Sequence, residues 1–141
     1  MAGEWRGSQT FNTGGAPMSG DAVDHVGKAI GGRYIEERLS TTLPGRKPSD
    51  TRHLLTYDPT QKHFRAWWFN DSSVGAMELA GDLDGSKLVL VSKPTDTGSP
   101  APVVFRATYE RVDGSHLGYK LEIQTGDTWR ELFHTVYSRV R

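Results

Sequence analysis

Histidine is the side chain best suited to carry chemistry in this sequence, because it titrates near neutral pH and also ligates metals. The chain has five histidines, and none falls in a His-x-His or His-Glu-x-x-His spacing. They are His25, His53, His63, His116 and His134. If the last hairpin turn centres on Gly126, His116 and His134 share a strand face and offer two metal ligands without a third. We therefore expect surface or hydrogen-bonded histidines and no metal site.

A second group of residues is suited to acid–base chemistry, which needs paired groups with different pKa values. Tyr34, Glu36 and Arg38 alternate along residues 33–40. The opposite face of the same segment carries Ile35, Glu37 and Leu39. If the first face points inward, Glu36 and Tyr34 form a catalytic candidate pair for cyclising or isomerising a small, for example polyketide-like, substrate without a cofactor. The alternative is that these charged residues lie on a strand face exposed to solvent and have no catalytic role.

Motifs for several other reaction classes are absent from the sequence. The chain has no cysteine, which excludes disulfides and thiolate chemistry. It also lacks the Gly-x-Ser-x-Gly elbow of esterases, the Gly-x-x-x-x-Gly-Lys phosphate loop and the Gly-x-Gly-x-x-Gly dinucleotide fingerprint. The sequence therefore argues against hydrolase, kinase and dinucleotide-dependent roles, and we expect no cofactor.

The charge balance argues against nucleic acid as a partner. The 141 residues carry 17 basic and 17 acidic side chains, without the cationic surplus that phosphate binding requires. The longest apolar runs, residues 66–69 and 88–91, have four residues, far fewer than the roughly 20 of a membrane-spanning helix. The first residues lack the pattern of a signal peptide. We therefore expect a cytoplasmic protein without nucleic-acid or membrane partners.

The elements that must position these residues are strands, because period-two alternation and turn dipeptides dominate the chain. Ten segments alternate in this way: residues 4–11, 22–30, 33–40, 52–57, 63–70, 76–80, 87–92, 103–112, 116–124 and 128–140. Short loops connect most neighbours, which favours hairpins in sequence order. The sequence predicts one all-β domain over residues 1–141, an antiparallel up-and-down β-barrel of about eight to ten strands.

A barrel of this size either fills its interior with side chains or encloses one small ligand. On residues 116–124 the apolar set Leu117, Tyr119, Leu121 and Ile123 falls on one face, which predicts an inward face. For residues 128–140 the alternation does not decide which face points inward. We expect the barrel to bind a small, apolar or amphipathic molecule. The predicted ligand-binding residues are the wall residues Tyr34, Trp67, Tyr109 and Tyr119, and Glu36 or Arg38 as orienting groups.

Two adjacent tryptophans, Trp67 and Trp68, must face opposite ways on one strand. If the turn over residues 58–62 centres near Thr60, Trp67 lies opposite His53 and Trp68 points to the other face with Phe64. A large aromatic pair outside the barrel predicts a second packed layer or a homodimer interface.

Several short motifs resemble, in order and spacing from Gly3 to Arg139, a bacterial family of domains of unknown function with a lipocalin-like, calycin-type β-barrel. They are residues 3–7 (Gly-Glu-Trp-Arg-Gly), 31–34 (Gly-Gly-Arg-Tyr), 57–59 (Tyr-Asp-Pro), the aromatic strand ending at Trp67, Gly81 before residues 84–85 (Asp-Gly), and 137–139 (Tyr-Ser-Arg). The resemblance implies a barrel with an interior site. The chain departs from the family pattern at Thr56, where a glycine is usual, and the stretch from Phe11 to Gly20 has no assignable counterpart.

The opening Gly-x-Trp also resembles the first signature of lipocalins, which implies that Trp5 packs at the barrel floor beneath Arg139, a structural pair. A similar opening occurs in nitrobindin-like barrels, which hold haem through a histidine near the C-terminus. That more distant resemblance implies His134 as a haem axial ligand, against the ordinary alternative of a hydrogen-bonded histidine.

Overall fold

The computed structural model describes residues 2–12 and 14–141, and its secondary structure is built from ten strands. Their bounds are β1 (Gly3–Phe11), β2 (Met18–Ala29), β3 (Tyr34–Thr42), β4 (Thr51–Asp58), β5 (His63–Asn70), β6 (Met77–Asp84), β7 (Lys87–Ser92), β8 (Phe105–Arg111), β9 (His116–Thr125) and β10 (Thr128–Arg139). Over the described ranges no helix has the length and apolar character needed to cross a membrane.

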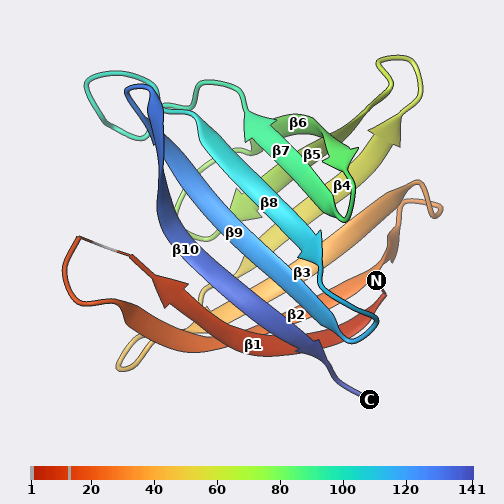
Figure 1. Cartoon of the computed structure of the whole chain (residues 1–141), viewed down its shortest axis with the longest axis horizontal. Coiled ribbons are helices and arrows are strands. Elements are labelled where there is room, and N and C mark those ends of the chain that lie inside the picture. Colours follow the sequence, from red (N-terminus) through yellow and green to blue (C-terminus); the bar gives the residue numbers. More distant parts are fainter. Residues whose placement is uncertain (1, 13) are drawn as a thin grey trace.

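The strands form one closed antiparallel barrel in up-and-down order (Figure 1). Each strand pairs with its neighbours in the chain, and β1 pairs with β10 from Trp5 opposite Arg139 to Phe11 opposite Phe133. Closure leaves no free sheet edge among the described strands. The predicted all-β up-and-down barrel, a fold of the calycin type, is therefore confirmed.

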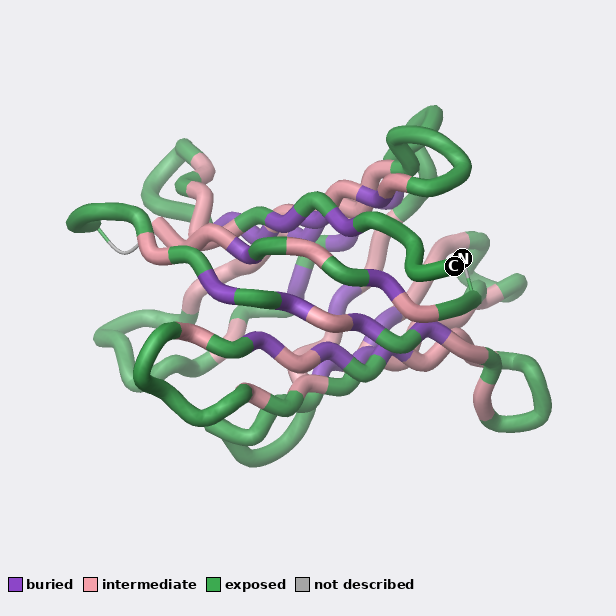
Figure 2. The backbone as a smooth tube through the Cα atoms, turned by 90° about the horizontal axis from the view of Figure 1, so that it is seen from below, coloured by how far each residue is buried: buried purple, intermediate pink, exposed green. Residues whose placement is uncertain are grey.

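Alternation along the strands separates an inner face from an outer face, as the buried and exposed segments of Figure 2 show. Of the four predicted inward residues on β9, Leu117, Tyr119 and Leu121 are buried and Ile123 is partly buried. On β10 a register irregularity between Glu131 and Phe133 changes the pairing with β9. Beyond it Phe133, Thr135 and Tyr137 turn inward, which the mixed sequence of this strand left open.

The two ends of the barrel differ in how they are filled. Both termini lie at the same end of the barrel (Figure 1). The interior at this end is packed with buried side chains: Trp5, Val26, Leu88, Leu117 and Tyr137. The opposite end carries the loops after β1, β3, β5, β7 and β9, including the long connections over residues 43–50 and 93–104. Packing therefore closes one end, and the hollow part of the barrel lies toward the other.

The β4–β5 register differs by one residue from the sequence prediction. Asp58 pairs with His63, so His53 lies opposite Trp68 and not opposite Trp67. The connecting turn has four residues and ends at Lys62, whose φ of 56° is positive. Because opposite residues share a face, this shift places Trp68 inside the barrel and Trp67 outside.

The stretch between Phe11 and Gly20 is also more regular than the sequence indicated. β2 begins at Met18, which pairs with Phe11, so the last part of this stretch belongs to the first hairpin. Thr13 lies outside the described residues.

Candidate functional site

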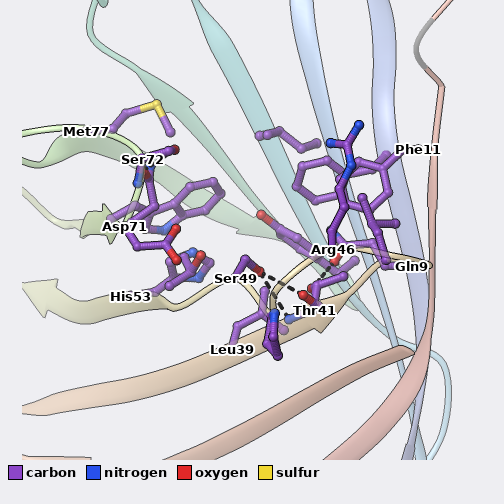
Figure 3. A pocket seen from close by; sticks show the side chains of 18 of the residues that line it. Gln9, Phe11, Leu39, Thr41, Arg46, Ser49, His53, Asp71, Ser72 and Met77 are labelled. Atoms are coloured by element: carbon purple, nitrogen blue, oxygen red, sulfur yellow. Dashed lines mark hydrogen bonds between the residues drawn. The ribbon is translucent and has the colours of Figure 1, made fainter. Parts of the chain in front are cut away.

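A cavity of about 660 Å³ occupies the open half of the barrel (Figure 3). Its inner walls are mainly apolar, and the apolar residues come from strands on all sides of the barrel: Phe11, Leu39, Trp68, Met77, Phe105, Tyr119, Leu121 and Phe133. The volume lies within the range of roughly 300–1,000 Å³ that is usual for small-molecule sites, which are also mainly apolar. The interior is thus hollow at one end and solid at the other.

A buried polar cluster borders the deep part of this cavity. Nδ1 of His53 lies 2.8 Å from Oε2 of Glu37, and the Tyr109 hydroxyl donates a hydrogen bond of 2.9 Å to the same oxygen. Glu37 and His53 are each only 4% exposed. Nδ1 also lies 3.1 Å from the Tyr109 hydroxyl, whose proton is directed to Glu37. The tautomer that fits these contacts carries a proton on Nδ1, which donates to the carboxylate.

Aromatic rings hold the His53 imidazole in place. Its ring is stacked on Trp68, with centroids 4.2 Å apart and an interplanar angle of 18°. Tyr119 packs against both rings, and its ring centroid lies 6.4 Å from that of His53 and 6.1 Å from that of Trp68. His53, Trp68 and Tyr119 all border the cavity, so the imidazole is part of an aromatic floor.

Asp24 lies close to this cluster and is also almost fully buried. Burial, and secondarily the negative charge of Glu37, raise its pKa from the ordinary 3.8 to about 8. Its Oδ1 has no hydrogen-bond partner among the described residues, which removes the usual compensation for a buried charge. At neutral pH Asp24 is therefore mostly protonated.

The same environment keeps the buried tyrosines protonated. Burial, followed by the charge of Glu37, raises the pKa of Tyr109 and of Tyr119 well above the ordinary value of 10. Burial also raises the pKa of Tyr137, with Asp24 as the next cause. Ionised tyrosine is thus disfavoured throughout the interior, and Tyr109 serves as a hydrogen-bond donor to Glu37.

Hydrogen bonds fix the loop at the mouth of the cavity. The buried Thr41 hydroxyl donates to Oε1 of Gln9 at 2.6 Å, which joins β3 to β1 across the wall. The backbone N–H of Ser49 donates to the Thr41 carbonyl at 2.8 Å, and the Ser49 hydroxyl accepts from the Thr41 N–H at 3.1 Å. Figure 3 shows these bonds beside Arg46. The loop over residues 43–49 is therefore attached to the rim at its C-terminal end.

The rim carries an unbalanced positive charge. Arg46 and Lys47 border the cavity and are exposed, and neither forms an ion pair with any described residue. The carboxylate of Asp71 also borders the mouth, and it accepts a hydrogen bond from the backbone N–H of Asp50. The mouth can therefore attract an anionic group of a ligand.

On β3 the structure places the predicted ligand-binding residues outside the barrel. Tyr34, Glu36 and Arg38 lie on the outer face, where Arg38 donates to Glu36 through Nε at 3.1 Å. Ile35, Glu37 and Leu39 turn inward, although this places a carboxylate in the interior. The burial of two aliphatic side chains, together with two hydrogen bonds to Glu37, accounts for this choice of face.

The other predicted wall residues are divided between the two sides. Tyr119 borders the cavity, and Tyr109 lies beneath its floor in contact with Glu37. Trp67 lies outside the barrel. The guanidinium carbon of Arg65 is 5.0 Å from the centre of the Trp67 ring, and the indole Nε1 donates a hydrogen bond to Glu78 at 3.3 Å. The one-residue shift between β4 and β5 explains this correction, because it exchanges the sides of Trp67 and Trp68.

The structural pair implied by the lipocalin resemblance is brought together at the packed end. The Arg139 guanidinium carbon lies 5.9 Å from the ring centre of the buried Trp5. Its Nη2 also donates to the carbonyl of Ala2 at 2.9 Å.

The two C-terminal histidines point away from the cavity. His134 lies on the outer face of β10, half exposed, with Nδ1 at 2.9 Å from Oε2 of Glu131. His116 pairs with Asp113 at 2.8 Å in the β8–β9 turn. Among the described side chains no group of three or more His, Cys, Asp or Glu is placed to hold a metal ion.

The residues that sequence reasoning missed are Asp24, Glu37, His53 and Trp68. The signal for Asp24 was present, since it alternates with Gly20, Ala22 and Val26 in a run of small and apolar residues. His53 and Trp68 required the correct β4–β5 register, and Glu37 required knowledge of its partners on β4 and β8.

Comparisons with known proteins agree with this architecture. The sequence profile of the family described as "Protein of unknown function (DUF1579)" matches residues 1–139. The crystal structure of Rv2717c from M. tuberculosis is similar over 99% of this chain and 92% of that chain, with a TM-score of 0.71 and 17% identity. At this identity the likeness concerns the fold alone. No curated protein matches the chain.

Proposed function

The chain belongs to the DUF1579 family, and we propose that it binds a small, largely apolar molecule inside its barrel. The observation that carries this proposal is the cavity of about 660 Å³ at the open end, walled by aromatic and aliphatic side chains. Transfer of apolar ligand surface from water into such walls is favourable by roughly 25 cal/mol per Å². A preformed barrel also needs little reorganisation to receive the ligand.

The rim supports a refinement toward amphipathic molecules. Arg46 and Lys47 border the entrance, while the interior below them is apolar. A molecule with an apolar body and an acidic end would bury the body and leave the acidic group near these cations. Glu36 and Tyr34, the candidate catalytic pair, lie outside the barrel and therefore do not face a molecule bound inside it.

The experiment uses the uncharged fluorophore N-phenyl-1-naphthylamine, whose emission rises in apolar surroundings. Leu121 is buried on the cavity wall, and Leu121→Trp would place an indole in the space proposed for the ligand. We expect this variant to lose most of the probe binding. Val136 is 57% exposed on the outer face of β10, so Val136→Trp is the matched control and should bind like the wild type.

Equal binding by the wild type and both variants would place the probe elsewhere and contradict the proposal. Absence of binding by the wild type would contradict it as well. Urea unfolding of each variant verifies that the barrel is intact before the affinities are compared.

A further inference from the structure

We propose that His53 is the polar anchor of the cavity and that its Nε2 accepts a hydrogen bond from a weakly acidic aromatic hydroxyl, as in a phenol or naphthol. The proposal rests on the proposed function, since it requires a ligand inside the barrel. It adds the chemical class of that ligand and the atom that recognises it.

The two ring nitrogens of His53 differ in their hydrogen bonding. We assign the tautomer in which Nδ1–H donates to Glu37 at 2.8 Å, and in this tautomer the lone pair of the imidazole lies on Nε2. Nε2 forms no hydrogen bond with any described residue. Among the described residues, two side-chain atoms are fully enclosed and have no hydrogen-bond partner: Asp24 Oδ1 and Thr135 Oγ1. His53 Nε2 is not one of these enclosed atoms. The acceptor atom is therefore in contact with open space.

The open space beside Nε2 is the cavity. His53 is 96% buried and its ring borders the cavity, as Figure 3 shows. A nearly buried acceptor without a protein partner loses the hydrogen bonds it would make to water. A donor on the bound molecule would restore that bond, which makes Nε2 a determinant of specificity.

The aromatic rings beside His53 favour a ligand whose donor group is attached to an aromatic body. The imidazole is stacked on Trp68, and Tyr119 and Phe133 lie beside the same space. Offset-stacked and edge-to-face contacts with such rings favour a flat aromatic body. An aromatic hydroxyl is more acidic than an aliphatic one and is therefore the stronger donor to an imidazole nitrogen.

Glu37 and Tyr109 act as positioning residues for this anchor. Glu37 fixes the ring orientation and the proton on Nδ1, and it would stabilise positive charge on the imidazole as the shared proton approaches Nε2. Tyr109 completes the arrangement by donating to the same carboxylate oxygen at 2.9 Å. Neither side chain has to touch the ligand.

The test compares 2-naphthol with 2-methoxynaphthalene, which has nearly the same size and ring system but no hydroxyl proton. Measurements are made at a mildly alkaline pH at which 2-naphthol is still protonated. In the wild type we expect 2-naphthol to bind roughly tenfold more tightly, which corresponds to about 1.4 kcal/mol. Bound 2-naphthol should also emit in its naphtholate band, because its excited state transfers the proton to an adjacent base.

The variant His53→Asn keeps an N–H donor for Glu37 and removes Nε2. It should bind the two compounds with similar affinity and abolish the naphtholate emission. The exposed His25 on the outer face of β2 gives the control His25→Asn, which should behave like the wild type. An unchanged preference for 2-naphthol in His53→Asn would overturn the proposal.

A measurement on the wild-type chain covers the case in which His53→Asn fails to fold. The ¹⁵N resonance of His53 Nε2 should move toward that of a protonated nitrogen when 2-naphthol is added, and should not do so with 2-methoxynaphthalene. No such movement would overturn the anchor. Binding of both compounds without a preference would overturn the anchor but leave the cavity as a binding site, whereas binding of neither compound or the fluorophore would overturn both.

Discussion

Replacing Asp24 by asparagine should remove a pH dependence from the stability of the barrel. The pKa of this buried carboxyl is raised from 3.8 to about 8, first by burial and then by the charge of Glu37. At a pH between these two pKa values, Asp24 holds a proton in the folded chain and has released it in the unfolded chain. Stability should therefore fall as the pH rises from about 4 to about 8 and then level off.

The size of this effect follows from the raised pKa. Each pH unit within the window changes the free energy of unfolding by about 1.4 kcal/mol. From pH 5 to pH 8 the loss is therefore on the order of 4 kcal/mol. A domain typically has about 5–15 kcal/mol of stability in total, so the loss would be a large fraction of it. Asp24→Asn keeps the size of the side chain without the proton equilibrium and should abolish most of this slope.

The assay is urea unfolding followed by tryptophan fluorescence, repeated between about pH 5 and about pH 9. The buried tyrosines stay protonated over this range because their pKa values are raised, so they add no slope. Asp21 is exposed on the outer face of the same strand, and Asp21→Asn should retain the wild-type slope. The reasoning would be refuted by a wild-type stability that is constant or rises with pH, or by an Asp24→Asn variant that keeps the slope.

Two further predictions concern the wall and the rim of the barrel. A Cβ at Gly81 would collide with the carbonyl oxygen of Val89 on β7, so Gly81→Ala should lower the free energy of unfolding by about 1–3 kcal/mol. Gly27→Ala, where the added atom meets nothing within 4 Å, is the control, and equal losses for both variants in urea unfolding would contradict this explanation. At the rim, the Arg46→Gln, Lys47→Gln double variant should bind the sulfonated fluorophore 1-anilinonaphthalene-8-sulfonate roughly two- to tenfold more weakly and bind N-phenyl-1-naphthylamine as before. The difference in affinity between the wild type and the double variant should shrink as salt is added. A loss of affinity for both fluorophores would argue against an electrostatic role for Arg46 and Lys47.

The strand order and most of the hairpins could be predicted from the sequence, because alternation and turn residues are local signals. The inward set on β9 is the clearest example, since Leu117, Tyr119 and Leu121 form an unbroken apolar face. The two glycines in the β2–β3 turn, with φ of 67° and 79°, similarly fix that connection.

The candidate site could not be predicted in the same way, since it depends on register and on partners distant in the chain. A single-residue difference in the length of the β4–β5 turn exchanged Trp67 and Trp68 between the two sides of the sheet. From the sequence alone, Glu37 is predicted to be a surface carboxylate. Its burial becomes favourable through the contacts with His53 on β4 and Tyr109 on β8. Alternation gives a face for each residue, but long-range contacts decide which face is inside.

The pairing of β1 with β10 bears on how the chain folds. Every other ladder among the described strands joins neighbours in the sequence, whereas this one joins the first strand to the last. Bringing such distant segments together has the largest entropic cost, so this seam is expected to form late. Until it forms, the nascent sheet has two unsatisfied edges that can recruit the edges of another molecule. Efficient refolding should therefore favour dilute solution.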